Sequence, residues 1–195
     1  LLALRIGGDG EVRTGSAAPL RVAVESARAP AGDAALEQLG RRVSSALIAG
    51  LGTRKGVEVV SGGDGDVVVQ ATLAPLLAGP AGAAVTHLTV AAVEGSTAVI
   101  LAVFERDTAV AASAQAETAA LAAIGDALEL EAACREMAAE DPLHGFLSRR
   151  TRSVAAARAF QQGLAAYTRT RWRDAVAGFD AAIAADPAFW PGHLY

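Results

Sequence analysis

The sequence predicts an α/β (α+β) domain with a mixed sheet of about five strands and two packed helices, followed by an all-α helical hairpin. Three observations support this fold class. Five short runs between residues 20 and 105 alternate like strands, residues 33–51 and 109–139 have helical spacing, and residues 154–187 contain two short helical patterns joined by a turn. The 195 residues are enough to bury a core in one or two domains.

The predicted strands are residues 20–25, 57–60, 67–73, 87–93 and 98–105. The third run, VVVQATL, is apolar enough for a central strand. The last two runs flank the sequence EGST at residues 94–97, which is typical of a hairpin turn. The predicted order is therefore one strand, one helix and four strands, before a second helix.

Two helices are predicted to pack on this sheet. The first begins after Asp33, a favourable N-cap residue, and ends at Gly50 and Gly52. Its apolar stripe consists of Leu36, Leu39, Val43, Leu47 and Leu51. The second helix spans residues 109–139 and ends or bends before Pro142. Because one helix would leave one face of the sheet bare, we expect the second helix to cover the opposite face.

The net charge of −4 is unevenly distributed along the chain. Residues 1–148 carry 10 basic and 18 acidic side chains, whereas residues 149–195 carry 7 basic and 3 acidic ones. The basic residues of the second part are Arg149, Arg150, Arg152, Arg158, Arg169, Arg171 and Arg173. They are scattered and have little aromatic interleaving, so we expect a solvated or inter-domain face and no nucleic-acid partner. A nucleic-acid contact stays the alternative.

Catalytic, cofactor-binding and metal sites are not expected in this chain. The glycine–aspartate clusters at residues 7–10 and 62–66 do not open a helix, so they indicate turns and not phosphate loops. The histidines His87, His144 and His193 lie in three different elements. The single cysteine, Cys134, excludes an internal disulfide and a CxxC metal site. We therefore predict no enzyme activity in this region and no cofactor.

Residues 154–187 resemble one tetratricopeptide repeat (TPR). The structural positions of the repeat are occupied by Gly163, Trp172, Ala175, Phe179, Ala182 and Pro187. The resemblance implies two packed helices, in which Trp172, Phe179 and Ile183 fill the space beside Gly163, and it implies that residues 188–195 begin a further repeat. The groove-facing positions of a TPR correspond to Phe160, Leu164 and Tyr167, which are therefore candidate protein-binding residues. Their alternative role is packing.

Residues 20–140 are similar to the TolB amino-terminal-like (FlgO-like) domain. The segments LRVAVE, DVVVQATL and HLTVAAVEGSTAVILAVFERD carry this resemblance by their order. The chain departs from the family where Ala102 replaces the usual Trp, and where only residues 62–66 stand in place of an extra helix. In that family the domain often precedes TPRs and follows a membrane helix, with a serine/threonine kinase, nucleotide cyclase or winged-helix domain further upstream.

These resemblances imply a non-catalytic protein-interaction or sensory region of a larger bacterial signalling protein. The hairpin would then dock a protein or peptide ligand, which we expect to be apolar. The alternative is a cell-envelope assembly or scaffold protein. Residues 1–19 and 141–153 are predicted linkers, and the apolar residues 1–6 suggest a membrane anchor upstream. The extracytoplasmic side of a membrane is therefore the expected location, with the cytoplasm as the alternative.

Overall fold

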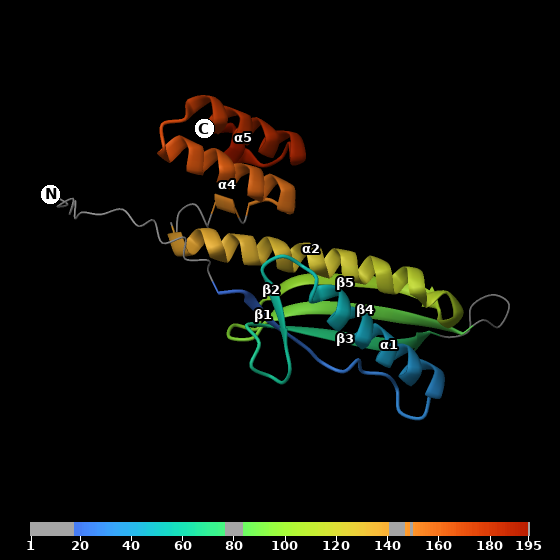
Figure 1. The fold of residues 1–195 in the computed structure, drawn as a ribbon. Coiled ribbons are helices and arrows are strands. Elements are labelled where there is room, and N and C mark those ends of the chain that lie inside the picture. The colour runs from blue at the N-terminus through green and yellow to red at the C-terminus, as the bar shows by residue number, and fades with distance from the viewer. Residues whose placement is uncertain (1–17, 77–83, 141–146, 149, 195) are drawn as a thin grey trace.

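The computed structural model describes residues 18–76, 84–140, 147–148 and 150–194 (Figure 1). A five-stranded mixed sheet packs against two helices, and a helical hairpin lies on the far side of the longer helix (Figure 1). The elements of the α+β domain are β1 (Leu20–Val24), α1 (Ala34–Leu51), β2 (Val57–Val60), β3 (Val67–Leu76), β4 (Val85–Glu94), β5 (Ile100–Ala109), η1 (Val110–Ala112) and α2 (Ser113–Glu140). This confirms the predicted domain with a mixed sheet of five strands.

The strand order in the sheet is β2-β1-β3-β4-β5. Strand β1 is parallel to both β2 and β3, and α1 provides the crossover that a parallel β1–β2 pair requires. Strands β3, β4 and β5 form an antiparallel meander. Strand β3 extends three residues beyond its predicted end, because Pro75 and Leu76 still pair with Thr86 and Val85 of β4.

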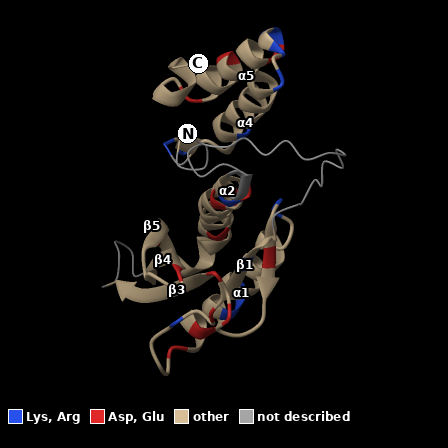
Figure 2. Cartoon of the chain, turned by 90° about the vertical axis from the view of Figure 1, so that its left-hand side faces the viewer, with Lys and Arg blue, Asp and Glu red and all other residues tan. Residues whose placement is uncertain are grey.

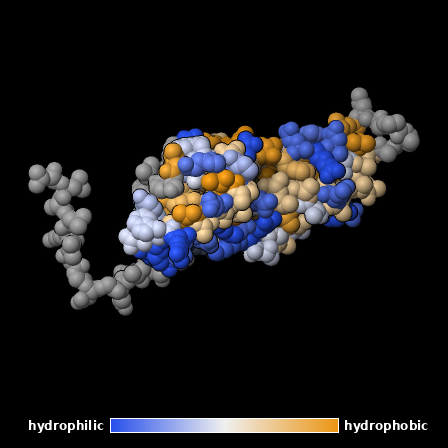
Figure 3. Space-filling view, turned by 90° about the horizontal axis from the view of Figure 1, so that it is seen from above, coloured by the Kyte–Doolittle hydropathy of each residue, from blue (hydrophilic) through white to orange (hydrophobic). Residues whose placement is uncertain are grey.

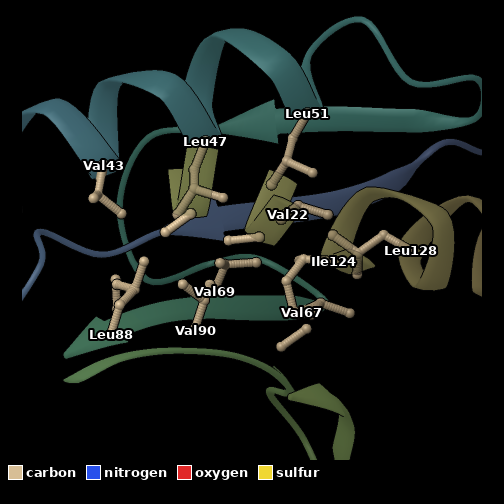
Figure 4. Packing of buried hydrophobic residues seen from close by; sticks show 14 of the residues in the cluster. Val22, Val43, Leu47, Leu51, Val67, Val69, Leu88, Val90, Ile124 and Leu128 are labelled. Atoms are coloured by element: carbon tan, nitrogen blue, oxygen red, sulfur yellow. The ribbon is translucent and has the colours of Figure 1, made fainter. Parts of the chain in front are cut away.

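Both helices cover the same face of the sheet, which corrects the expectation that they cover opposite faces. Leu47 of α1 and Ile124 of α2 belong to one core with Val69 and Val90 of the sheet (Figure 4). The helices also touch each other, since a Cβ on Gly50 would lie 2.2 Å from the Leu121 side chain. The opposite face carries half-buried or exposed residues: Val68, Gln70, Thr72, His87, Thr89, Glu105 and Asp107. This face is polar enough to contact water, as one face of an antiparallel sheet commonly does.

The helix ends follow local capping rules. The Asp33 carboxylate accepts hydrogen bonds from the backbone N–H groups of Ala35 and Leu36, both at 3.1 Å, as its predicted N-cap role requires. Helix α2 begins at Ser113 and not at residue 109, because Ala109 still pairs with Val85 and a 3₁₀ turn follows. The backbone pairing of the strand thus overrides the helix propensity of the alanines.

The C-terminal part consists of α4 (Val154–Thr168), α5 (Trp172–Ala185) and the 3₁₀ helix η2 (Trp190–His193). Helices α4 and α5 are antiparallel, since Phe160 lies beside Phe179 and Tyr167 lies beside Trp172. They approach closely at Gly163 and Gly178, because a Cβ on Gly178 would lie 2.6 Å from the Gly163 Cα. The pair therefore forms a tight helical hairpin with its own small core.

That small core departs from the expectation in one respect. Trp172 was predicted to fill the space between the helices, but it is 57% exposed. It stands at the first position of α5, beside the turn, where its ring points away from the hairpin core. Phe189 fills the core instead, with its ring edge-on to Phe160 at a centroid distance of 5.1 Å.

Candidate functional site

The turn between α4 and α5 brings two aromatic side chains together on the surface. The backbone N–H groups of Arg169 and Arg171 donate to the Ala166 carbonyl at 3.1 and 2.9 Å, so α4 ends in a tight turn. Thr170 completes the turn with a φ of 58°, in the left-handed region. This geometry places the Tyr167 and Trp172 rings edge-on, with centroids 5.2 Å apart and planes at 78°.

Tyr167, Trp172 and Val176 form one exposed apolar surface, which we term the aromatic patch. Their exposed fractions are 43%, 57% and 55%, and Val176 lies one helical turn after Trp172 on α5. In Figure 3, which views the molecule from above, apolar and hydrophilic residues lie interspersed on the surface. Large exposed aromatic groups of this kind are characteristic of binding surfaces.

Exposed arginines surround the aromatic patch. Arg169 and Arg171 lie in the turn, and Arg173 follows Trp172 on α5. Figure 2 shows this basic end of the hairpin in blue. Within the described chain, Asp174 partly balances the charge through an ion pair with Arg171 at 3.2 Å. The patch is therefore apolar at its centre and positively charged at its rim.

The structure separates the three candidate protein-binding residues. Phe160 and Leu164 are 0% and 4% exposed, and both belong to the hairpin core. Their side chains pack between helices, which is the alternative that the sequence left open. Only Tyr167 reaches the surface, so the candidate site narrows to this residue and its neighbour Trp172.

The residues predicted to be structural in the hairpin are mostly in its interior. Ala175, Phe179 and Ala182 are buried, and a Cβ on Gly163 would lie 2.7 Å from the Phe179 ring. Pro187 is exposed and follows the end of α5. Trp172 is the functional candidate that sequence reasoning assigned to packing. The sequence did contain a signal that Trp172 is exposed, because this residue directly follows the turn and lies between two arginines.

The hairpin is anchored on α2 by polar contacts. Arg158 of α4 forms an ion pair with Glu129 of α2, and Glu129 also lies 3.5 Å from Arg54. The Gln161 amide donates to the Ala133 carbonyl at 3.0 Å. Helix α2 thus lies between the sheet and the hairpin, and contacts both (Figure 1).

The histidines and the cysteine that the structure describes lie in separate parts of the chain. The described residues contain no group of three or more His, Cys, Asp or Glu side chains that could hold a metal ion. His87 lies 2.6 Å from Asp107 on the helix-free face of the sheet, and His193 contacts the Pro187 carbonyl at the other end of the molecule. His144 and the cluster at residues 7–10 lie outside the described residues. Cys134 is buried.

The cluster at residues 62–66 forms the connection between β2 and β3. Gly62 has a φ of 92°, which favours glycine. Asp66 accepts a hydrogen bond from the Arg21 backbone N–H at 3.1 Å and pairs with Arg135 at 3.6 Å. The carboxylate is therefore used to hold strand and helix ends together. In the part of the chain that the structure describes, no helix has the length and apolar character needed to span a membrane.

Comparison with known proteins found solved structures that align with part of this chain. A PelC dodecamer from Paraburkholderia phytofirmans shares 14% identity, over 57% of this chain and 88% of that chain, with a TM-score of 0.41. A Xanthomonas campestris protein of the DUF330 family shares 16% identity over 60% and 82% of the two chains, with a TM-score of 0.34. A neuraminyllactose-binding hemagglutinin homologue from Helicobacter pylori shares 15% identity over 65% and 84%, with a TM-score of 0.30. No family model and no curated protein matches the chain.

The resemblance to the TolB amino-terminal-like domain and to a TPR is therefore wrong. Neither family has a model that matches the chain, and the similar structures are those of PelC, DUF330 and hemagglutinin-homologue proteins. The bacterial signalling context, the upstream kinase or cyclase and the array of repeats depended on that resemblance. What stands is an α+β domain with a helical hairpin attached to its long helix.

Proposed function

We propose that this chain is a non-catalytic protein-interaction region whose aromatic patch docks a partner protein. The observation that carries the proposal is the exposure of the paired Tyr167 and Trp172 rings. Tyrosine, tryptophan and arginine are the residue types that contribute most to binding energy at protein interfaces. The rings are already held in contact, so little side-chain entropy is lost when a partner covers them.

The partner surface should combine apolar and acidic side chains. Arg169 and Arg173 at the rim of the patch favour carboxylates, and Val176 extends the apolar centre. Rim charges chiefly raise the association rate and give it a salt dependence. A nucleic-acid ligand is disfavoured because the arginines stand at a single turn and do not form a stripe along a helix.

The proposal is tested by capture experiments with the full chain and two tryptophan variants. Trp172→Ala removes the centre of the patch, whereas Trp190→Ala removes another exposed tryptophan, 47% exposed, in η2 beyond the opposite end of α5. We expect Trp172→Ala to lose the specifically captured protein and Trp190→Ala to retain it. Equal capture by both variants would show that the patch is not the docking surface.

A further inference from the structure

The helix-free face of the sheet has an apolar half. Paired residues of neighbouring strands point to the same face, so the register of β3, β4 and β5 identifies the side chains that point away from α1 and α2. In one half of the face these side chains are Val68, Ala91, Val93, Ile100 and Val103. Ile100 and Val103 are 61% and 48% exposed, so this half presents apolar surface that another molecule can cover.

The other half of the same face is acidic. Glu105 and Asp107 point to it as alternate residues of β5. Asp107 lies 2.6 Å from His87, whereas Glu105 forms no ion pair with a described residue. Arg106 points to the opposite face of the sheet, because its partner in β4 is the buried Leu88. With the histidine neutral, this half of the face therefore carries the two negative charges of β5.

The charges near β1 and β2 balance one another. Arg21 of β1 lies opposite Glu58 of β2 in the parallel register. Arg28, in the segment after β1, forms an ion pair with Glu25 at 3.3 Å. Among the described residues, the net negative charge of the helix-free face consequently lies on β5, beside the apolar half.

The turn of the hairpin has the complementary composition. The aromatic patch supplies apolar surface there, and Arg171 is neutralised by its ion pair with Asp174. Arg169 and Arg173 are exposed and form no ion pair with a described residue. Asp180, the next acidic residue of α5, lies about two helical turns beyond Arg173. Apolar surface beside two positive charges thus matches apolar surface beside two negative charges.

The two surfaces lie on opposite sides of the molecule. Helix α2 covers one face of the sheet and also contacts the hairpin, so the helix-free face points away from the hairpin. Figure 2 shows the blue turn of the hairpin and the strands β3, β4 and β5 at opposite ends. A chain therefore cannot bring its own aromatic patch onto its own helix-free face, whereas a second copy can. The longer-range field favours the same contact, since residues 1–148 are acidic in sum and residues 149–195 are basic.

We infer that the partner of the aromatic patch is a second copy of this chain, and that the patch docks on the helix-free face of that copy. This inference rests on the function proposed for the patch. Tyr167 and Trp172 cover the apolar half, and the arginines of the turn lie against Glu105 and Asp107. Because the contact joins two different surfaces, it is head-to-tail, and further copies can add to form a ring or an open chain.

The self-association of the full 195-residue chain is measured by sedimentation velocity at concentrations up to about 1 mM. Val103→Lys places a positive charge in the apolar half of the face. Ile48→Lys is its control, because Ile48 is 47% exposed and lies on α1. We expect Trp172→Ala and Val103→Lys each to weaken self-association by at least about tenfold, and Ile48→Lys to leave it unchanged.

Mixing two variants tests the head-to-tail geometry. The Trp172→Ala chain keeps an intact helix-free face, and the Val103→Lys chain keeps an intact patch. Neither chain should associate alone, but an equimolar mixture should form a one-to-one complex. This complex should grow no further, because its two remaining surfaces are the altered ones. A patch that packed on the patch of a second copy would give no such complex.

Salt tests the charged part of the contact. Raising the ionic strength from about 0.05 M to about 0.5 M should weaken self-association about fivefold, because it screens the arginines from the carboxylates of β5. Glu105→Gln should weaken self-association at low salt and reduce its dependence on salt.

Four results would each overturn the inference: a chain that is monomeric at all these concentrations, equal effects of Val103→Lys and Ile48→Lys, a mixture that forms no complex, and self-association that salt does not weaken. The function proposed for the patch is judged separately. If the chain is monomeric but Trp172→Ala still abolishes capture of another protein, this inference fails and the proposed function stands. If neither self-association nor capture depends on Trp172, both fail.

Discussion

Arg158 on α4 and Glu129 on α2 form an ion pair across the junction between the hairpin and the α+β domain. The Glu129 side chain is only 12% exposed, and it also lies 3.5 Å from Arg54 in the loop after α1. One carboxylate therefore connects three separate parts of the chain. The excess of arginine near the hairpin, which the sequence assigned to a solvated or inter-domain face, includes at least one inter-domain residue.

Replacing Glu129 by alanine should weaken this junction. The two guanidinium groups of Arg54 and Arg158 would lose a shared, largely buried carboxylate and remain close to each other. We expect the free energy of unfolding in urea to fall by about 1.5 kcal/mol. Glu136→Ala is the control, because Glu136 is an exposed residue of the same helix and should change the value by less than about 0.5 kcal/mol. Equal effects of both substitutions would contradict the role of Glu129.

Gly178→Ala should destabilise the hairpin strongly. A Cβ there would lie 2.6 Å from the Gly163 backbone and 3.0 Å from the Ala159 carbonyl, and neither group can rotate away. Overpacking of this kind costs about 1–3 kcal/mol or more, which a thermal unfolding curve would detect. Gly63→Ala is the control, since a Cβ on Gly63 meets nothing within 4 Å. A stable Gly178→Ala variant would mean that α4 and α5 are further apart than described.

Alanine substitutions at Phe160 and Tyr167 should have different effects: the first should mainly lower the stability of the hairpin, and the second should mainly lower partner capture. Phe160→Ala removes a fully buried ring that contacts Phe179 and Phe189, so we expect a loss of about 3–5 kcal/mol in unfolding free energy. Tyr167→Ala should cost less than about 1 kcal/mol because the ring is 43% exposed. Partner capture should nevertheless fall with Tyr167→Ala. If Tyr167→Ala lowered the unfolding free energy more than Phe160→Ala does, the described packing of the hairpin would be contradicted.

Asp33→Ala tests the cap of α1. The carboxylate satisfies two backbone N–H groups at the first turn of the helix. Its removal should lower the unfolding free energy by about 1 kcal/mol, as loss of an N-cap usually does. Asp64→Ala, in the exposed loop after β2, should have no measurable effect. If both variants unfold at the same denaturant concentration, α1 is not stabilised by this cap.

Local features of the fold could be predicted from the sequence. Alternating residues identified the five strands, and Asp33 with Gly52 identified the ends of α1, because these signals depend on neighbouring residues only. The face that α2 covers could not be predicted in this way. It depends on the contact of Leu121 with Gly50, some 70 positions apart in the sequence, and on the polarity of the other sheet face.

The incorrect resemblance has a physical explanation. Gly163, Ala175, Phe179 and Ala182 satisfy the packing needs of any antiparallel helix pair that approaches closely at small residues. Spacing alone therefore did not distinguish a TPR from another helical hairpin. The candidate site depended on Trp172, and its exposure follows from its place beside a turn, which the repeat pattern obscured.

The docking of a partner on the aromatic patch is tested most directly by photocrosslinking from position 167. The full chain would carry p-benzoylphenylalanine in place of Tyr167, whose ring borders Trp172 at 5.2 Å. We predict one crosslinked protein partner, which is lost when Trp172→Ala is added and retained when Trp190→Ala is added. Absence of a protein adduct, or an adduct that Trp172→Ala leaves unchanged, would contradict the proposed function.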